Sequence, residues 1–149
     1  MDSLNTSSRF LRPEVRRLEA RFGGISSMRI SKLLINCSYM ENLEHLHLER
    51  FSLIPYLPLL SLVLPKIKTL KLIACELTDE IGVHLKNAYL LESLSLAQND
   101  CIEGSFLPDL KNLHELDISR CFQINDINYL SEFCINNSNL KKLNLMENS

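Results

Sequence analysis

The sequence predicts an α/β fold in which one short unit repeats along the chain. Parallel strands would form a curved sheet on the concave side, with helices and irregular returns on the convex side. The first observation is a six-residue phrase, aliphatic-x-x-aliphatic-x-aliphatic, typical of a short strand whose alternate residues turn inward. It occurs five times, as Leu43-Leu46-Leu48, Ile67-Leu70-Leu72, Leu91-Leu94-Leu96, Leu113-Leu116-Ile118 and Leu140-Leu143-Leu145. The second observation is the spacing of these copies, whose starts lie 24, 24, 22 and 27 residues apart.

This spacing falls within the range of about 20–29 residues that is typical of leucine-rich repeats. We therefore predict a leucine-rich-repeat solenoid of five to six repeats over residues 25–149. The sixth and earliest copy would be Ile25-Met28-Ile30, which starts 18 residues before Leu43.

Residues 1–24 are expected to form a tail and a capping helix. The helix would run from Pro13 to Phe22, because proline suits a first turn and Gly23-Gly24 suits a helix end. Solenoids need covers over their terminal cores. We find no such cover after the last strand and expect the C-terminal end of the repeat domain to be truncated.

A third observation is a small polar or thiol residue at a fixed place after each of the last four strands. Where a strand turns away, buried amides and carbonyls need hydrogen-bond partners. Asparagine supplies both donors and an acceptor, whereas cysteine is a weak donor that packs well. We expect these hydrogen bonds to the turning backbone to come from Cys75, Asn99, Cys121 and Asn148.

The returns between strands are expected to differ. Residues 51–65 contain three prolines and predict an irregular packed segment, and residues 103–112 predict an extended stretch or one tight turn. A helix is predicted after Thr78-Asp79-Glu80, because threonine suits an N-cap and acids suit a first turn. Its inward residues would be Ile81, Leu85 and Ala88; a second helix, after Asn125-Asp126, would turn Ile127, Leu130 and Cys134 inward.

Composition argues against several classes of function. The chain has 16 Lys plus Arg against 18 Asp plus Glu, a net charge of −2, which gives no general attraction to nucleic acid or to an anionic membrane. Five cysteines without a C-x-x-C pair are a poor disulfide framework and a poor zinc site. We expect reduced thiols, with Cys37 and Cys101 filling the core, in a monomer of the cytoplasm or nucleus without a cofactor.

Two units carry a more specific pattern: Leu113-x-x-Leu116-x-Ile118-x-x-Cys121-x-x-Ile124-x-Asp126, followed by Leu130, Cys134, Leu140 and Leu143, and a looser copy with Cys75, Leu77, Thr78 and Asp79. The pattern resembles the cysteine-containing leucine-rich repeats of F-box proteins. This resemblance implies a substrate-recognition component of an SCF-type, cullin-based ubiquitin ligase, in which an F-box binds the adaptor and the repeats hold the substrate. Ahead of the repeats, only Leu11-Arg12-Pro13-Glu14-Val15 faintly echoes an F-box.

Alternate strand residues between the inward aliphatics would line the concave sheet, where partners of repeat proteins usually bind. We predict a protein-binding stripe there; binding through the edge loops is the alternative. Offsets in the phrase assign the stripe to His45, His47, Glu49, Thr69, Lys71, Ile73, Ser93, Ser95, Glu115, Asp117, Ser119, Lys142 and Asn144, with Ser27, Arg29 and Ser31 from the earliest copy.

Catalytic and metal interpretations are weaker. His45-x-His47 would direct two imidazoles the same way, but a zinc site needs three or four converging ligands, so we expect histidines facing solvent. Together with these histidines, Ser93, Ser95 and Asp117 supply the residue types of a catalytic serine–histidine–acid triad. We do not expect a working triad, because a regular sheet supplies no oxyanion donors and no strained turn. We predict that the chain is not an enzyme.

Three functions are thus separated. The first is a non-catalytic protein–protein interaction module, for which the resemblance implies a place in an SCF-type ligase. The alternative is a regulatory or inhibitory repeat protein that binds an enzyme or signalling partner. The third, a metal-dependent enzyme centred on His45 and His47, is disfavoured.

Overall fold

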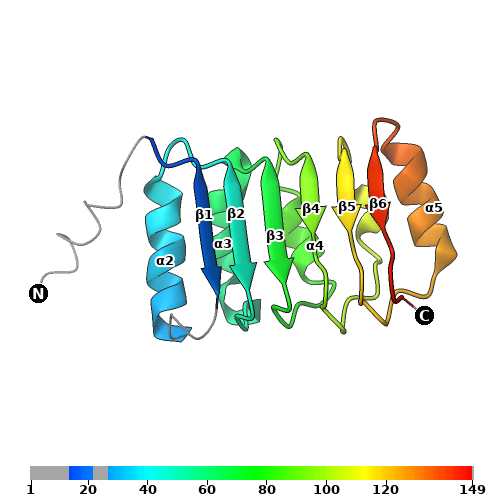
Figure 1. The fold of residues 1–149 in the computed structure, drawn as a ribbon, viewed down its shortest axis with the longest axis horizontal. Helices are drawn as coiled ribbons and strands as arrows, with labels where there is room; N and C mark the ends of the chain where they lie inside the picture. Colours follow the sequence, from blue (N-terminus) through cyan, green and yellow to red (C-terminus); the bar gives the residue numbers. More distant parts are fainter. Residues whose placement is uncertain (1–13, 22–26, 149) are drawn as a thin grey trace, which may run out of the picture.

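The computed structural model describes residues 14–21 and 27–148, with the side chains of Ser27 and Met28 left aside. Six strands form one sheet in sequence order, and every neighbouring pair is parallel (Figure 1). The strands are β1 (Arg17–Arg21), β2 (His45–Glu49), β3 (Thr69–Ile73), β4 (Ser93–Ser95), β5 (Glu115–Asp117) and β6 (Lys142–Asn144). The α-helices are α2 (Ser27–Tyr39), α3 (Leu57–Val63), α4 (Ile81–Leu85) and α5 (Ile127–Asn136), and the 3-10 turns are η1 (Ile54–Tyr56), η2 (Leu64–Lys66) and η3 (Leu107–Asp109). The predicted α/β class with a parallel sheet is confirmed.

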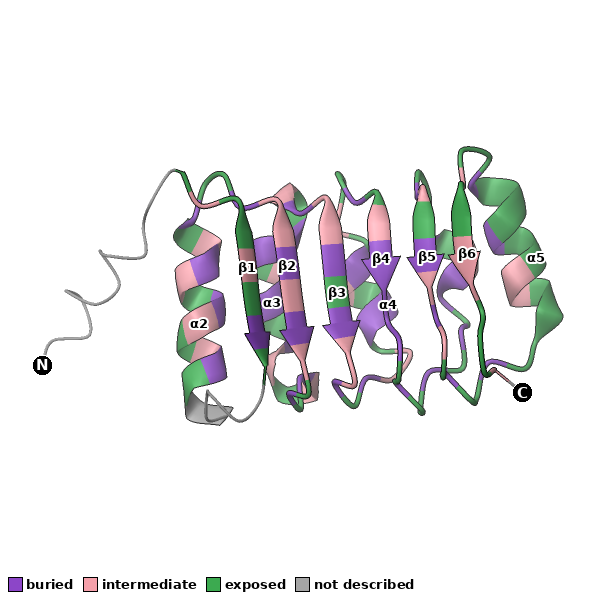
Figure 2. Ribbon diagram, in the orientation of Figure 1, coloured by how far each residue is buried: buried purple, intermediate pink, exposed green. Residues whose placement is uncertain are grey.

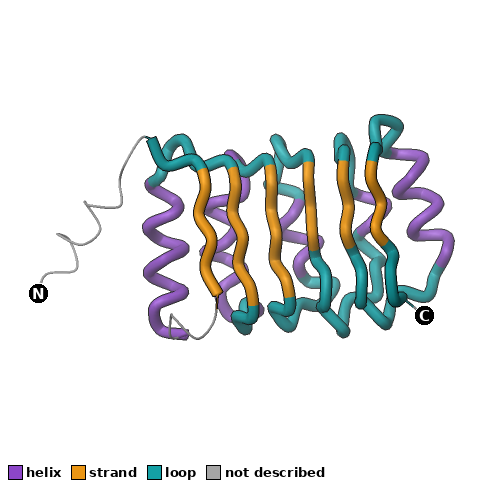
Figure 3. Tube along the Cα trace, in the orientation of Figure 1, coloured by secondary structure: helices purple, strands orange, loops and turns teal. Residues whose placement is uncertain are grey.

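The described helices and 3-10 turns lie behind one face of the sheet, and none of them covers the other face (Figures 1 and 3). We call this second face the open face. Helix α3 contacts both α2 and α4, and α5 contacts η3. The five aliphatic phrases coincide with β2 to β6, and their middle leucines are register partners across the sheet.

The core lies between the sheet and the helices, and the aliphatic phrase builds it (Figure 2). Leu46, Leu70, Leu94 and Leu116 are each at most 1% exposed. Their β6 equivalent, Leu143, is only half-buried, because β6 has a strand on one side only.

A left-handed residue follows each of the last five strands, one to three residues after the strand ends. Arg50, Ala74, Gln98, Arg120 and Glu147 all have φ between 53° and 64°. None is glycine, although a side chain at such a φ is uncommon and costs about 1 kcal/mol or more. The amides of the first four donate to the neighbouring strand or the residues just after it, at 2.9 to 3.0 Å. This pairing holds the chain in the left-handed turn.

The predictions at the N-terminal end were wrong in secondary structure. Residues 17–21, expected in a helix, form β1, and residues 27–30, expected in a strand, begin α2. The predicted bounds Pro13, Phe22, Gly23-Gly24 and Ile25 lie outside the described residues. Strand β1 pairs with β2 through five register partners, so backbone pairing between distant segments overrode the local helix signals. In α2, Ile30, Leu34 and Cys37 recur at helical period and are at most 1% exposed.

Residues 51–65 are regular where an irregular segment was predicted. The turns and helix η1, α3 and η2 follow each other directly, and each has a proline in its first two positions. Proline lacks only an amide that a first helical turn leaves unpaired, so it starts a helix well. The three prolines therefore restart the helical path instead of breaking it, and Leu57, Leu60 and Val63 are fully buried.

The later returns follow the predictions in part. Helix α4 buries Ile81 and Leu85, and residues 107–109 form a single tight turn, as expected. In α5 the predicted inward face holds only at Leu130, which is half-buried and packs against the core. Ile127 is 68% exposed and Cys134 is exposed, so these two predictions were wrong, whereas Phe133 is fully buried. Helix α5 lies at one end of the molecule and contacts chiefly η3, so only a narrow strip of it is covered.

Candidate functional site

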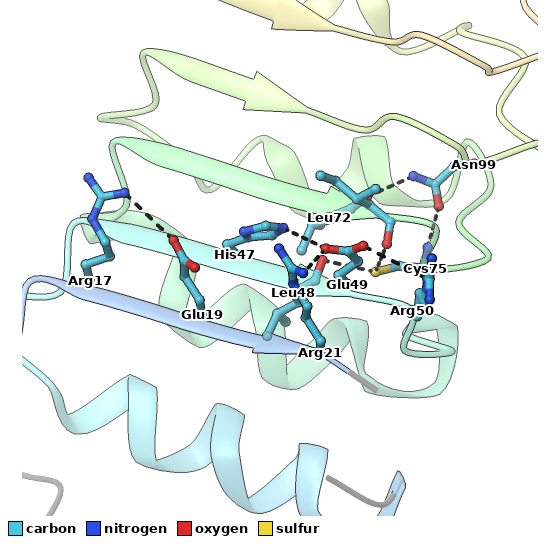
Figure 4. A network of polar contacts seen from close by, with 11 residues as sticks. Arg17, Glu19, Arg21, His47, Leu48, Glu49, Arg50, Leu72, Cys75 and Asn99 are labelled. Atoms are coloured by element: carbon cyan, nitrogen blue, oxygen red, sulfur yellow. Dashed lines mark hydrogen bonds and ion pairs between the residues drawn. The ribbon is translucent and has the colours of Figure 1, made fainter. Parts of the chain in front are cut away.

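The strand exits carry the polar positions that the sequence singled out, and these are structural. Asn99 is 1% exposed; its Oδ1 accepts from the amides of Cys75 (3.0 Å) and Leu77 (3.1 Å). Its Nδ2 donates to the carbonyl of Leu72 at 2.9 Å, one strand away (Figure 4), and also to the carbonyl of Leu96 at 2.7 Å. Asn148 repeats this with Cys121 and Ile118. The predicted hydrogen bonding of these side chains to the turning backbone is confirmed.

The cysteines at this place act as weak donors. Cys75 Sγ donates to the carbonyl of Leu48 at 3.5 Å, and Cys121 Sγ donates to that of Leu96 at 3.2 Å. Burial raises the pKa of both thiols to about 11, so they remain protonated and unreactive. Cys37 is buried as predicted, but Cys101 is exposed, which corrects its assignment to the core.

The open face consists of side chains in register rows that cross the strands. The central row contains one residue from each strand: Glu19, His47, Lys71, Ser95, Asp117 and Asn144. A row beside it contains Arg17, His45, Thr69, Ser93, Glu115 and Lys142. The third row contains Arg21, Glu49 and Ile73, and Ser119 lies just beyond the end of β5. The predicted stripe residues of β2 to β6 are thus brought together, whereas Ser27, Arg29 and Ser31 belong to α2 and are separate from it.

Charges on β1 and β2 largely neutralise one another (Figure 4). The Glu49 carboxylate forms ion pairs with Arg21 at 3.1 Å and with Arg50 at 4.0 Å. His47 Nε2 lies 3.5 Å from the same carboxylate. Glu19 faces Arg17 at 4.0 Å. This end of the open face already has partners within the chain.

The two histidines are covered more than expected. The side chains of His45 and His47 are 30% and 15% exposed, and His45 Nδ1 and His47 Nε2 are buried atoms without a hydrogen bond. Within residues 14–21 and 27–148, no group of three His, Cys, Asp or Glu side chains is placed to hold a metal ion.

A hollow of about 210 Å³ lies over β4, where the strand presents small side chains. Its lining includes Lys71 from β3, Ser93 and Ser95 from β4, Glu115 and Asp117 from β5, and Lys142 from β6. Ser93 Oγ donates to Glu115 at 3.2 Å. Ser95 is only 7% exposed, and its Oγ has no hydrogen-bond partner among the described residues.

The charged side chains that line the hollow make no ion pair with another described residue, and two of them, Lys71 and Asp117, belong to the central row. Lys71 is exposed and makes no ion pair with another described residue. Asp117 uses Oδ1 to accept from the amide of Ser119 at 3.0 Å and has no cationic partner in the described chain. Within the hollow, the central row therefore offers an ammonium, a carboxylate and a buried hydroxyl without mutual contacts.

The serine–histidine–acid set drawn from the sequence is not assembled. Ser93 donates to Glu115, the Ser95 hydroxyl has no partner in the part of the chain that the structure describes, and the histidines of β2 lie two strands from β4. A different serine–histidine contact, Ser61 Oγ to His84 Nδ1 at 2.5 Å, joins α3 to α4 behind the sheet. It holds two helices together.

Sequence reasoning missed several residues that the structure makes important. Three of them, at the β1 ends of the register rows, are Arg17, Glu19 and Arg21. The signal for them is Val15-x-x-Leu18-x-Ala20, a copy of the aliphatic phrase that ends in alanine. Asn137, just after α5, is 3% exposed and joins the end of this helix to the segment that leads into β5, because its Oδ1 accepts from the amide of Leu113 at 2.9 Å. No periodic signal marks Asn137.

Comparison with known proteins adds no family. No protein-family model matches the chain, and no curated protein gives a significant match. In the described part of the chain, each helix is too short or too polar to cross a lipid bilayer.

Proposed function

We propose that this chain is a leucine-rich-repeat solenoid that binds another protein through the open face of its sheet. The repeat assignment is supported by three features at fixed places in successive units: the aliphatic phrase, the left-handed residue after the strand, and the buried Asn or Cys that follows. The open face would be the concave side of the solenoid.

The hollow over β4 carries the proposal. A buried hydroxyl without a partner costs about 1–3 kcal/mol, so a surface that retains one gains when a ligand supplies the missing hydrogen bond. Lys71 and Asp117 add charges that a partner would complement. Binding, not catalysis, is the role that such a set supports.

Within this proposal, the resemblance of the cysteine-containing units favours a substrate receptor of an SCF-type ubiquitin ligase. A regulatory or inhibitory repeat protein that binds an enzyme or signalling partner is the alternative. We propose either role for a monomer in the cytoplasm or nucleus, without nucleic acid or membrane as partner.

Site-specific photo-crosslinking tests the face. A photoreactive phenylalanine analogue at Thr69, on the open face, is compared with the same analogue at Val83, which is 66% exposed on α4. The expected result is a discrete adduct from the Thr69 position that excess unlabelled protein competes away. Adducts from Val83 alone would contradict the proposal. Co-purification of a cullin and its adaptor would support the ligase version, and their absence would favour the alternative.

A further inference from the structure

We infer that the hollow over β4 receives an extended segment of the partner in which an acidic and a basic side chain are three residues apart. This inference rests on the proposed function and names the chemistry of the partner. Lys71, Ser95 and Asp117 lie side by side in the central row, on β3, β4 and β5. The acidic side chain of the partner faces Lys71, and the basic one faces Asp117.

The spacing follows from the sheet. Lys71 and Asp117 are separated by two strand intervals, which is about 10 Å for neighbours about 4.8 Å apart. In a polyproline-like segment, residues i and i+3 point the same way and are about 9 Å apart. In a β-strand, same-side residues are about 7 or 13 Å apart, so neither spacing matches. An i, i+3 pair on a polyproline-like path fits the two charges.

The size of the hollow favours single side chains over a helix. A volume of about 210 Å³ holds one or two side chains, whereas an α-helix has a diameter of about 10–12 Å. Ser95 Oγ lies between the two charges and can donate to a peptide carbonyl or accept from a peptide amide. It supplies the contact to the backbone between the charged residues.

The other end of the row is a poorer match. Glu19 is also two strands from Lys71, but it already faces Arg17, and the larger His47 occupies the place that Ser95 has in the hollow. Glu19 is therefore a matched control for Asp117, with the same charge in the same row.

The probe is a fluorescent, blocked octapeptide, Gly-Ser-Glu-Pro-Pro-Arg-Ser-Gly. Two peptides of the same length serve as controls, with Glu and Arg adjacent or with Arg replaced by Glu. Fluorescence anisotropy at low salt is expected to give at least fivefold tighter binding for the probe. Lys71→Glu and Asp117→Lys are each expected to weaken it about tenfold, which corresponds to about 1.4 kcal/mol.

The reciprocal variant carries both Lys71→Asp and Asp117→Lys and so keeps one charge of each sign. It is expected to bind the same peptide in the opposite chain direction, with an affinity within about threefold of the wild type. Glu19→Lys is expected to leave the affinity within about twofold. Ser95→Ala is expected to weaken the probe about threefold without lowering the urea midpoint of the protein, because it removes a hydroxyl that has no partner.

Equal binding of all three peptides, no binding by the folded protein at about 1 mM probe, or equal effects of Glu19→Lys and Asp117→Lys would overturn the inference. The crosslinks from Thr69 make this failure distinguishable from failure of the proposed function. Crosslinks that persist in Asp117→Lys leave the open face as the binding surface and refute only the i, i+3 pair.

Discussion

Replacing Asn99 with alanine tests the hydrogen bonding that joins successive strand exits. The side chain, 1% exposed, accepts from the amides of Cys75 and Leu77 and donates to the carbonyl of Leu72. Alanine leaves both amides and this carbonyl buried without their partner. The carbonyls of Leu96 and Ala97 keep other donors.

Each unsatisfied buried group costs about 1–3 kcal/mol, so Asn99→Ala is expected to lower the free energy of unfolding by about 4 kcal/mol. The matched control is Asn148→Ala, the same place one strand beyond Cys121. Its amide oxygen accepts from Cys121 at 2.8 Å and its nitrogen donates to Ile118 at 2.9 Å. Because Asn148 is half-buried at the end of the sheet, water can replace these partners, and the expected loss is about 1 kcal/mol.

Urea unfolding followed by circular dichroism measures both losses. Tyrosine fluorescence provides a second probe, since the chain has four tyrosines and no tryptophan. A loss below about 1 kcal/mol for Asn99→Ala, or a loss equal to that of Asn148→Ala, would refute the reasoning. A fully unfolded Asn99→Ala beside a folded Asn148→Ala would agree with it.

Three further predictions concern the buried face of α5, the stability of the protein at acidic pH and the reactivity of the thiols. Phe133→Ala is expected to lower the free energy of unfolding by about 3–5 kcal/mol, and Ile127→Ala on the same helix by less than about 0.5 kcal/mol; equal losses in urea melts would contradict the assigned face of α5. Burial opposes ionisation of Asp79, but hydrogen bonds from the Ser105 hydroxyl and from the amides of residues 103–105 outweigh it and lower the pKa. The stability that this carboxylate contributes is therefore present above the ordinary pKa of 3.8 and is lost as pH falls through the lower folded pKa. The difference in urea midpoint between wild type and Asp79→Asn should accordingly narrow as pH falls below 3.8 toward that lower pKa, and a constant difference would count against this assignment. Ellman's reagent is expected to titrate Cys101 and Cys134 in the folded protein and the three buried thiols only after unfolding, whereas rapid reaction of all five would show that the core is open.

The aliphatic phrase predicted most of the sheet because its information is local. Each of the five copies became a strand, and the alternation within each copy decided which side chains face the core and which face outward. The stripe on β2 to β6 follows from this alternation alone. The hollow does not, because its existence depends on the small residues of β4 lying between larger ones on two strands distant in sequence.

The errors share a cause. The segment around Leu18 has the charges and flanking residues of a helix as well as a copy of the strand phrase that ends in alanine, and pairing with β2 decides in favour of the strand. Helix α5 has several apolar stripes, and only its position beside η3 selects the one with Phe133. The prolines after β2 were interpreted as breakers, although their place in a first turn decides whether they break or begin a helix.

By itself, the sequence determined the parallel order of β2 to β6, their inward leucines and the polar place at each strand exit, because these depend on spacing along one chain. The tertiary structure alone decided that non-glycine residues adopt left-handed turns, and that Ser95 is buried between Lys71 and Asp117 without a hydrogen-bond partner among the described residues. These features arise from contacts between segments twenty or more residues apart, and their energies exceed the local preferences of the residues involved.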